Sequence, residues 1–419
     1  MLLESSLGKL VGSVRGGRVV ESRLGKLVER IRATEPVPLR IRLWTGRSYE
    51  LGPDPAVTLT VPTPSALRYF GSPDLMTLGE AYVEGHIDLE GRVAEAFRAC
   101  ERFTQAAGRG SAFAPSKRVT HTRGRDKKAI EFHYDVSNDF YRLFLDRNMV
   151  YSCAYYRAEG DSLDAAQEQK LDHILTKLQL RPGERLLDIG CGWGALIFRA
   201  AEKFGARAVG ITLSNNQYEH VREQIRARGL GDRCEVRLQD YRDVPEHGGY
   251  DKISSVGMFE HVGLDHLVAY FRQIQCLLKD GGLALNHGIT SVDPESRAVG
   301  MGAGDFIARY VFPHGELPHV GLALREMAAA GLEVVDVESL RRHYAQTCAE
   351  WAYRLEAHAD RARAIAGEKR FRIWSLYLAG CAYGFAHNWM SIYQVLACKQ
   401  GGPGMNPLPL TRAFMYPGG

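Results

Sequence analysis

The segment Leu186-Leu187-Asp188-Ile189-Gly190-Cys191-Gly192-Trp193-Gly194 contains the strongest fold signal in this chain. A short apolar strand runs directly into alternating glycines, and an apolar, helix-like stretch follows. Glycines at the end of a strand let the backbone approach a ligand and let the next helix begin tightly against the sheet. The segment therefore predicts a ligand-binding turn after the first strand of an α/β domain.

The sequence around this turn alternates helices with short apolar strands. We expect strands at residues 186–189, 208–211, 235–239, 252–256 and 283–286. This rhythm predicts a parallel, doubly wound sheet. The glycines alone also fit a dinucleotide-binding loop, with Ala195 as its last member. A dinucleotide site would need an acidic residue at the end of the second strand, and the chain has Thr212 there, so an NAD site is disfavoured.

The length and composition indicate a globular protein with more than one domain. A chain of 419 residues suits two or three domains, and 45% hydrophobic residues suffice for a full core. The net charge of +4 is too small to indicate a nucleic-acid partner. Residues 37–61 have a strand-like pattern, and residues 64–105 have a helical one. Residues 108–128 are basic and rich in Gly, Ser and Pro, which predicts a linker.

The first residues contain a short repeat, because Leu7-Gly8-Lys9-Leu10-Val11 recurs as Leu24-Gly25-Lys26-Leu27-Val28. Its apolar residues share one helical face, and basic residues surround them. One interpretation is a basic amphipathic segment on a membrane surface. The other is two short helices that pack on their own domain, although several glycines disfavour any helix here. The sequence leaves both open.

The eight cysteines occur singly and form no CxxC pair, so we expect neither a disulfide framework nor a metal site. Free thiols suggest a reducing compartment, and residues 1–10 lack the pattern of a secretory signal. Residues 373–398 contain no Asp, Glu, Lys or Arg. Polar residues interrupt this stretch, so we expect a buried helix and a final strand instead of a membrane span. The sequence predicts a cytoplasmic protein.

Several spaced motifs accompany the glycine turn, and together they carry a resemblance to a known family. They are Phe132-His133-Tyr134-Asp135, Tyr151-Ser152-Cys153-Ala154-Tyr155, Ala166-Gln167 with Lys170-Leu171, Thr212 to Gln217, Ser255 to Gly263, Tyr310 to Pro318, and Tyr344-Ala345-Gln346-Thr347. In this order, over about residues 128 to 400, they resemble the cyclopropane-fatty-acid synthases, which include the mycolic acid cyclopropane synthases. Gly79-Glu80-Ala81-Tyr82 is similar to the N-terminal domain of the phospholipid-acting members.

The resemblance implies a fold and a domain organisation. The fold would be that of a class I S-adenosylmethionine (SAM)-dependent methyltransferase, which is Rossmann-like with a seven-stranded, mostly parallel sheet. A smaller N-terminal α+β domain, residues 1–107, would contact lipid. Residues 108–128 would be a basic linker, and residues 129–419 the catalytic domain.

The resemblance also implies two sets of site residues. The cofactor SAM would be bound by Tyr151, Ser152, Asp188, Gly190, Cys191, Gly192, Gly194, Thr212, Ser214, Gln217, Asp240 and Tyr241. Asp240 would accept a hydrogen bond from the adenine amino group. A bound bicarbonate would be the catalytic base, held by Glu260, His287 and Tyr344 and by the backbone carbonyls of Cys153 and Ile289. We call these five positions the bicarbonate cage.

Two further positions of the resemblance need comment. Gly288 stands where relatives often have Thr, a departure that could loosen the cage. Cys381 matches a family cysteine suspected of a catalytic role, but its apolar surroundings disfavour a thiolate.

The chemistry explains why such residue types are needed. An isolated cis double bond is a poor nucleophile, so the reaction requires a sulfonium methyl group as electrophile. Methyl transfer leaves a carbocation, and a proton must leave the new methyl group before a ring can close. A carboxylate, an imidazole and a phenol can fix a small oxyanion beside that carbon. We therefore expect a cyclopropane fatty acid from unsaturated phospholipid acyl chains, made by an enzyme peripheral to the inner face of the membrane.

Four alternatives differ in substrate or in activity. The first is a fatty-acyl methyltransferase that leaves a methyl or methylene branch. The second is a small-amine N-methyltransferase, because some plant enzymes resemble the Phe259-Glu260-His261 region. The third is a nucleic-acid methyltransferase that uses the basic run 117–128, which no aromatic basic face accompanies. The fourth is a lipid-binding protein without catalysis, which would not need an intact cage. We expect no nucleic-acid partner, and the sequence leaves a homodimer open.

Overall fold

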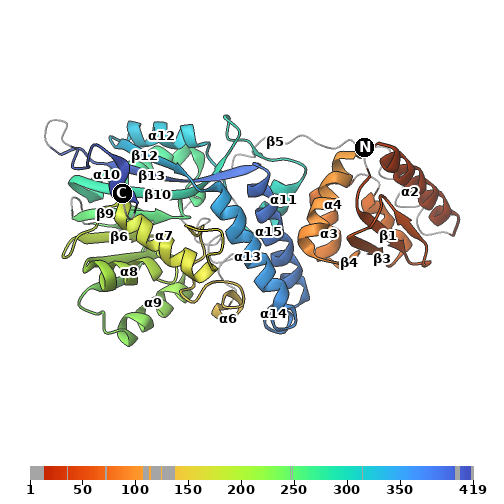
Figure 1. Cartoon of the computed structure of the whole chain (residues 1–419), viewed down its shortest axis with the longest axis horizontal. Helices are drawn as coiled ribbons and strands as arrows, with labels where there is room; N and C mark the ends of the chain where they lie inside the picture. The colour runs from red at the N-terminus through yellow and green to blue at the C-terminus, as the bar shows by residue number, and fades with distance from the viewer. Residues whose placement is uncertain are drawn as a thin grey trace. The chain divides into compact units, whose positions relative to one another are not determined.

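The structure is a computed structural model of the whole chain (Figure 1), and it describes residues 14–34, 36–70, 73–106, 113–114, 124, 137–245, 247, 249–313, 315–401 and 406–416. The chain forms two compact units. The first contains Met1–Ala114, Val299–Val311 and Leu355–Tyr383, and the second contains Pro115–Ala298, Phe312–Arg354 and Gly384–Gly419. The units thus do not follow a linear division near residues 107 and 129, because two later segments belong to the first unit. Most of the predicted linker and the Phe132-His133-Tyr134-Asp135 motif lie outside the described residues.

The second unit is built on a seven-stranded sheet with the order β12-β13-β10-β9-β6-β7-β8. Its strands are β6 (Arg185–Ile189), β7 (Arg207–Thr212), β8 (Cys234–Leu238), β9 (Tyr250–Val256), β10 (Leu278–Ser291), β12 (Glu333–Ser339) and β13 (Met390–Cys398). Strands β6 to β10 are parallel, and β13 is antiparallel to both of its neighbours. The predicted mostly parallel seven-stranded sheet is confirmed.

Helices cover both faces of this sheet (Figure 1). On one side lie α7 (Leu163–Lys177), α8 (Ala195–Phe204) and α9 (Asn215–Ala227), and on the other lie α10 (Leu267–Leu277) and α12 (Val320–Ala329). Because side chains alternate along a strand, Leu186 is buried in the first core and Leu187 in the second. The apolar residues that precede the glycines therefore pack into two different hydrophobic cores. The unit also contains the short helices α6 (Asn138–Tyr141), η2 (Tyr241–Asp243), η3 (Phe259–His261), η4 (Leu264–His266) and η5 (Arg412–Met415), and most of α13 (Arg341–Ala357).

The first unit contains a four-stranded sheet with the order β2-β1-β3-β4. Its elements are β1 (Leu39–Leu43), β2 (Ser48–Glu50), β3 (Val57–Val61), η1 (Pro64–Phe70), α3 (Leu75–Val83), β4 (Asp88–Glu90) and α4 (Val93–Ala106). They follow one long helix, α2 (Val14–Thr34). The strands between 37 and 61 and the mostly helical region from 64 to 105 agree with the sequence pattern. The two-residue strands β5 (Phe113–Ala114) and β11 (Ala298–Val299) stand at the unit boundaries.

Helix α2 corrects one expectation from the repeat. The second copy of the repeat lies within a single helix of 21 residues, although Gly16, Gly17 and Gly25 are part of it. Leu24, Val28 and Ile31 are buried in the core of the first unit. Packing of this apolar face outweighs the low helix propensity of glycine. The described apolar face of α2 therefore packs on its own domain, and the first copy of the repeat lies outside the described residues.

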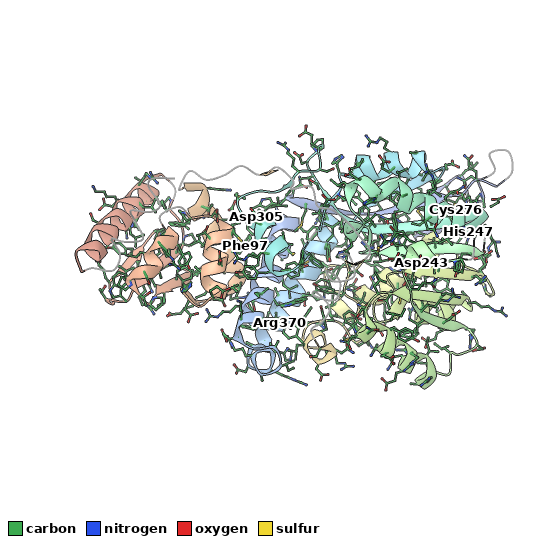
Figure 2. All side chains as sticks on the ribbon, turned by 180° about the vertical axis from the view of Figure 1, so that it is seen from behind. Phe97, Asp243, His247, Cys276, Asp305 and Arg370 are labelled. Carbon is green, nitrogen blue, oxygen red and sulfur yellow. The ribbon has the colours of Figure 1, made fainter. Side chains whose placement is uncertain are left out.

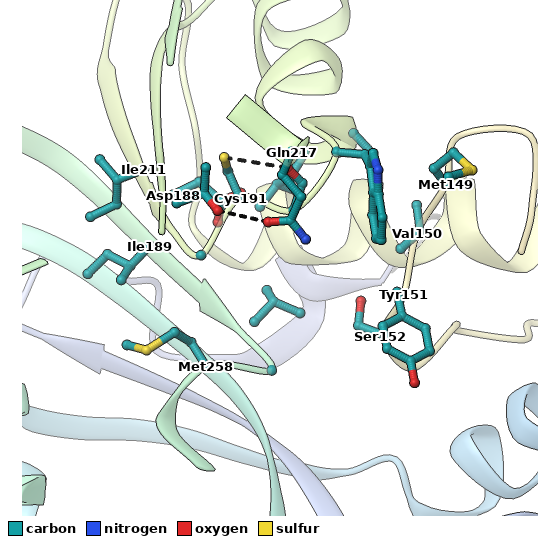
Figure 3. A pocket seen from close by; sticks show the side chains of 18 of the residues that line it. Met149, Val150, Tyr151, Ser152, Asp188, Ile189, Cys191, Ile211, Gln217 and Met258 are labelled. Atoms are coloured by element: carbon teal, nitrogen blue, oxygen red, sulfur yellow. Dashed lines mark hydrogen bonds between the residues drawn. The ribbon is translucent and has the colours of Figure 1, made fainter. Parts of the chain in front are cut away.

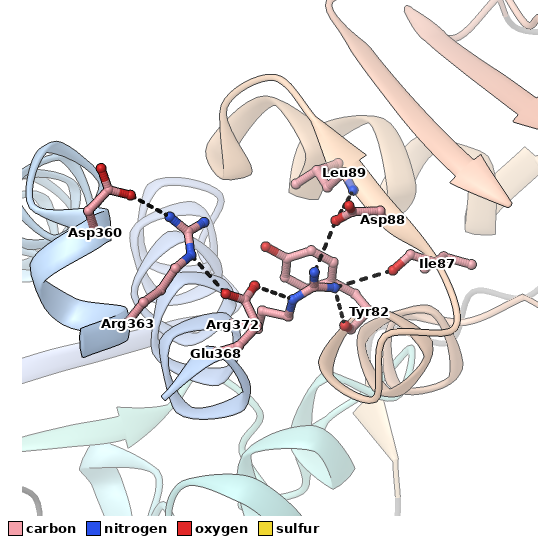
Figure 4. A network of polar contacts seen from close by, with 8 residues as sticks. All are labelled: Tyr82, Ile87, Asp88, Leu89, Asp360, Arg363, Glu368 and Arg372. Atoms are coloured by element: carbon pink, nitrogen blue, oxygen red, sulfur yellow. Dashed lines mark hydrogen bonds and ion pairs between the residues drawn. The ribbon is translucent and has the colours of Figure 1, made fainter. Parts of the chain in front are cut away.

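Two later segments complete the first unit, namely α11 (Ala303–Tyr310), and α14 (Ala359–Ala366) with most of α15 (Glu368–Ala386). On α15, Arg372 donates to the carbonyls of Tyr82 and Ile87, stands over the Tyr82 ring and forms ion pairs with Asp88 and Glu368 (Figure 4). This network joins α15 to α3 and β4.

Close backbone packing on α4 also holds α15 in the first unit. A Cβ atom on Gly380 would lie 2.9 Å from the ring of Phe97, so a larger residue there would require the ring to shift. Figure 2 labels Phe97. The predicted buried helix and final strand between 373 and 398 are α15 and β13. Among the helices that the structure describes, none has the length and apolar character needed to span a bilayer.

Candidate active site

A cavity opens at the carboxyl ends of β6, β7 and β9, which is where ligands bind in doubly wound sheets. Most of the predicted cofactor residues line it (Figure 3), namely Tyr151, Ser152, Asp188, Gly190, Cys191, Gly192, Thr212, Gln217 and Tyr241. Gly194, Ser214 and Asp240 are not among its lining residues. The cavity also includes residues that we did not predict, among them Lys170, Trp193, Gln239, Met258 and His261.

The glycine turn owes its shape to backbone conformations that other residues rarely adopt. Gly190, Gly192 and Gly194 have φ angles of 78°, 55° and 88°. The amides of Gly190 and Cys191 both donate to the carbonyl of Ile211 on β7. A Cβ atom on Gly194 would lie 2.8 Å from the Phe198 ring. Gly194 therefore serves the packing of α8, whereas Gly190 and Gly192 form the wall of the cavity.

The Thr-x-Ser sequence at the end of β7 positions Gln217. Ser214 caps α9, because its hydroxyl accepts from the Gln217 amide at 3.3 Å. The Thr212 hydroxyl donates to Oε1 of Gln217 at 2.8 Å and accepts from the Ser214 amide at 3.1 Å. Ser214 thus acts on the cavity through the position of Gln217, whose side chain faces it (Figure 3).

Asp240 lies in a second, adjoining cavity together with Tyr241, His261 and Gln273. Its carboxylate accepts from the Arg242 side chain, with Nε at 2.8 Å and Nη2 at 2.6 Å. The two cavities share Leu213, Tyr241, Met258 and His261. Asp240 is therefore close to the cofactor cavity without lining it, and its predicted contact with adenine stays a prediction.

Burial changes the ionisation of the polar groups around the glycine turn. The Asp188 carboxylate accepts from the Ser254 hydroxyl at 2.7 Å, and burial raises the pKa of Asp188 to about 6. Burial also raises the pKa of the Cys191 thiol well above its usual value. Near neutral pH the cavity therefore contains one carboxylate and a neutral thiol.

The segment that carries Tyr151 and Ser152 is fixed by side chains from two directions. Asp146 accepts from the amide of Val150 at 2.7 Å. The Gln167 amide group donates to the carbonyl of Ser152 at 2.9 Å, and Lys170 donates to its hydroxyl at 2.9 Å. The spacing Ala166-Gln167 to Lys170 was visible in the sequence. The sequence alone gave it no role, because the three-residue spacing of Gln167 and Lys170 shows only that two side chains share a helical face.

Glu260, His287 and Ile289 of the predicted cage lie on η3 and β10. Glu260 is buried, and its Oε1 accepts from the Ile289 amide at 2.6 Å. Its Oε2 has no hydrogen-bond partner among the described residues, and burial raises the pKa of Glu260 to about 7. Near neutral pH this carboxyl group is thus about half protonated and has a free oxygen.

His287 is buried on the same strand as Ile289, and burial lowers the pKa of its imidazole well below the usual value. The ring is therefore neutral. Its Nδ1 lies 3.4 Å from Nε2 of Gln394 on β13, and an amide NH₂ can only donate. With the amide in this orientation the imidazole proton is on Nε2, which has no partner among the described residues.

Cys153 and Tyr344 are linked to β10 and β13 through Leu340, which directly precedes α13. The Cys153 thiol contacts the carbonyl of Leu340, and the amide of Leu340 donates to the carbonyl of Ile392 at 2.9 Å. Ile392 is paired with Ile289 in the sheet. Tyr344 lies one turn after Leu340, and its ring packs against Phe385 and Trp351. These contacts connect all five predicted cage positions.

The cage is also connected to the cofactor cavity. Trp351 packs on Tyr344 and on Tyr151, with ring centroids 5.9 and 5.1 Å apart. The amide of Ala154 donates to the Thr347 hydroxyl at 3.1 Å, and that of Tyr156 donates to Nδ1 of His343 at 3.1 Å. Helix α13 therefore fixes the segment that follows Ser152 and Cys153.

The space beside Gly288 is filled, and a looser cage at this departure stays a prediction. A Cβ atom on Gly288 would lie 2.0 Å from Cε1 of Phe259, so the Phe259 ring occupies the space beside this glycine. Phe259 is buried and directly precedes Glu260. The missing side chain is thus replaced by an aromatic ring from η3.

Cys381 lies on α15 in the first unit, whereas the cage residues belong to the second. Burial raises the pKa of the Cys381 thiol to about 12, so it is protonated at neutral pH. Its catalytic role remains a prediction that no contact in the structure supports.

Comparisons with known proteins place this chain among methyltransferases of one family. Residues 121–395 match the family described as mycolic acid cyclopropane synthetase, and residues 27–106 match a domain of unknown function (DUF7884). The chain is 47% identical over 380 residues to a probable fatty acid methyltransferase from Pseudomonas putida, covering 91% of this chain and 96% of that protein. It is 38% identical over 279 residues to cyclopropane mycolic acid synthase 1 of Mycobacterium tuberculosis, covering 64% and 96%.

Solved structures show the same similarity in three dimensions. The cyclopropane synthase MmaA2 from Mycobacterium tuberculosis superposes with a TM-score of 0.63 at 35% identity, covering 65% of this chain and 98% of that one. The mycolic acid cyclopropane synthase CmaA1, complexed with SAH and CTAB, gives a TM-score of 0.61 at 36% identity, covering 65% and 98%. This chain therefore belongs to the mycolic acid cyclopropane synthetase family and is a SAM-dependent methyltransferase.

Proposed function

We propose that this enzyme transfers a methylene group from SAM to the cis double bond of an unsaturated phospholipid acyl chain and forms a cyclopropane, with bicarbonate as the general base. When bound, SAM supplies the electrophilic methyl group and bicarbonate accepts the proton that must leave it. The observation that carries the proposal is the pair of buried, unpartnered polar atoms, Glu260 Oε2 and His287 Nε2.

These two atoms suit a small oxyanion. Buried polar atoms normally have partners, because an unpaired one costs about 1–3 kcal/mol. A neutral imidazole with its proton on Nε2 can donate to an oxyanion, and so can a protonated Glu260. The raised pKa of Glu260 supports this, since an ionised carboxylate would repel bicarbonate. Tyr344 would add a phenol, and Cys153 and Ile289 would add backbone carbonyls for a bicarbonate proton.

A second candidate differs only in the product. The relative from Pseudomonas putida is named a probable fatty acid methyltransferase, and it matches nearly the whole chain. An enzyme of that kind would leave a methyl or methylene branch. The outcome depends on where the base holds the departing proton, and a displacement of about 1 Å is enough to matter.

Product analysis separates the two candidates. The enzyme would be incubated with ¹³C-methyl SAM and vesicles of a cis-monounsaturated phospholipid, and the extracted lipid would be examined by proton NMR. We expect upfield ring-methylene signals. Vinylidene protons or a new branch methyl in their place would favour the second candidate, and no label in the lipid would exclude both.

The membrane part of the proposal can be tested separately. The predicted linker 108–128 is strongly basic, and a basic residue near an anionic surface contributes about 1 kcal/mol. We expect tighter binding to anionic than to neutral vesicles, and weaker binding as salt increases. Equal binding to both vesicles at low and high salt would contradict peripheral attachment through this charge.

A further inference from the structure

Lys170 is a buried cation that has no role in the proposed reaction. It lies on α7 with 2% of its surface exposed, and it lines the cofactor cavity. Removing an ammonium group from water is expensive unless an anion replaces the lost hydration. The partners of Lys170 should therefore show what the residue is for.

A second buried lysine on the same helix provides the comparison. Lys177 is fully buried, and its Nζ lies 3.0 Å from Asp336 and 2.6 Å from Glu338. Lys170 has no carboxylate within ion-pair distance among the described residues. Its Nζ donates to the hydroxyl of Ser152 at 2.9 Å, which uses one of its three donors. Lys177 thus forms direct ion pairs with the protein, and Lys170 forms none among the described residues.

The charged residues that line the cavity indicate which anion would pair with Lys170. Lys170 and Asp188 are the only Lys, Arg, Asp or Glu side chains among the described residues that line it. Asp188 and Asp146 are close enough to favour the charged form of Lys170, although burial lowers its pKa to about 8. SAM carries a carboxylate and an ammonium group at its amino-acid end. A cavity with one cation and one carboxylate suits such a zwitterion.

We propose that Lys170, together with the Ser152 hydroxyl, binds the carboxylate of the methionine moiety of SAM. The inference rests on the use of SAM, and it is independent of the acyl substrate, the product and the base. Lys170 is then a cofactor-binding residue that makes the enzyme discriminate between SAM and an analogue without the carboxylate.

The test compares the binding of two ligands by isothermal titration calorimetry, without any turnover. The ligands are SAM and decarboxylated SAM, and the proteins are the wild type, Lys170→Met and Lys203→Met. Lys203 is an exposed lysine on α8 that pairs with Asp172, so its replacement controls for the loss of one positive charge. Thermal unfolding of each variant shows whether it is folded.

We expect the wild type to prefer SAM over decarboxylated SAM by about tenfold to a hundredfold, which is typical for a hydrogen bond to a charged group. Lys170→Met should weaken SAM binding by that factor and leave the binding of decarboxylated SAM unchanged or tighter. Lys203→Met should leave both affinities unchanged.

Two results would overturn the proposal. If Lys170→Met weakens both ligands equally, Lys170 only supports the segment that contains Ser152. If the wild type binds both ligands equally well, the carboxylate has no dedicated partner, and this result does not depend on any variant folding.

Discussion

The cofactor cavity and the bicarbonate cage lie side by side at one end of the same sheet, but they are built in opposite ways. In the cavity the polar groups mostly have protein partners, as Thr212 does with Gln217 and Asp188 with Ser254. In the cage, Glu260 Oε2 and His287 Nε2 are buried without a partner among the described residues. A site with unsatisfied groups has a cost in stability that its ligand offsets.

The largest effect that this comparison predicts is on stability. Burial raises the pKa of Glu260 from 4.5 to about 7, so the folded protein favours the protonated acid. Below pH 4.5 the group is protonated in both states and contributes nothing. Above pH 7 it is ionised in both states, and burial of the charge destabilises the fold by about 3 kcal/mol. Glu260→Gln should therefore gain about that much stability relative to wild type between pH 4.5 and pH 8.

Urea unfolding at both pH values, in buffers free of bicarbonate and SAM, measures this difference. Other groups titrate in both proteins. The test is therefore whether the difference in unfolding free energy between wild type and variant changes with pH. If the difference in stability between wild type and Glu260→Gln were the same at both pH values, Glu260 would have an ordinary pKa.

The second prediction separates rate from affinity. Glu260→Ala and Tyr344→Phe should each slow methylation by roughly tenfold to a hundredfold, the cost of about 1.5–3 kcal/mol for one lost hydrogen bond to a charged group. The affinity for SAM should change little, because neither residue lines the cofactor cavity. Single-turnover rates and calorimetric affinities check both statements. A large loss of SAM affinity would show that the two regions are not separate.

The third prediction concerns the ring that replaces a side chain beside the cage. Gly288→Ala should lower stability by about 1–3 kcal/mol, because the new Cβ would overlap Phe259 and overfill a packed core. Gly231→Ala is the matched control, since a Cβ there meets nothing within 4 Å. Phe259→Leu should relieve the effect in the double variant. An unchanged stability of Gly288→Ala would show that the ring moves freely.

The smallest predicted effect is on the cofactor side. If Asp240 accepts from the adenine amino group, Asp240→Ala should weaken SAM binding by about twofold to tenfold, as expected for one hydrogen bond of about 0.5–1.5 kcal/mol. The rate at saturating SAM should stay the same. An unchanged affinity would mean that the carboxylate serves only its ion pair with Arg242.

The same contrast explains which parts of the molecule the sequence could predict. The glycine turn lies within one continuous segment, so local rules predicted both its structure and its place at a ligand site, whereas the role of Thr212 to Gln217 was implied by the resemblance. The cage positions are up to 191 residues apart, from Cys153 to Tyr344. These positions could be predicted only from the resemblance to the family. No local sequence pattern shows that contacts through Leu340 and Ile392 link them.

Other features depended on tertiary packing that no spacing rule contains. The glycines of α2 argued against a helix, and burial of Leu24, Val28 and Ile31 produced one. The packing of the Phe259 ring beside Gly288 is also a property of the folded chain. So is the position of Lys170, which has no carboxylate within ion-pair distance among the described residues. Arg372 likewise places α15 with the N-terminal strands, a long-range arrangement that a linear division into domains cannot show.

The most direct test of the cage is the dependence of the rate on bicarbonate. Methylation of phospholipid vesicles would be measured in buffer freed of carbon dioxide, with bicarbonate then added back in steps. We predict a rate near zero at the start, saturable recovery in the wild type, and recovery in Tyr344→Phe only at higher bicarbonate concentrations. Full activity of the wild type without bicarbonate, unchanged by its addition, would contradict the account.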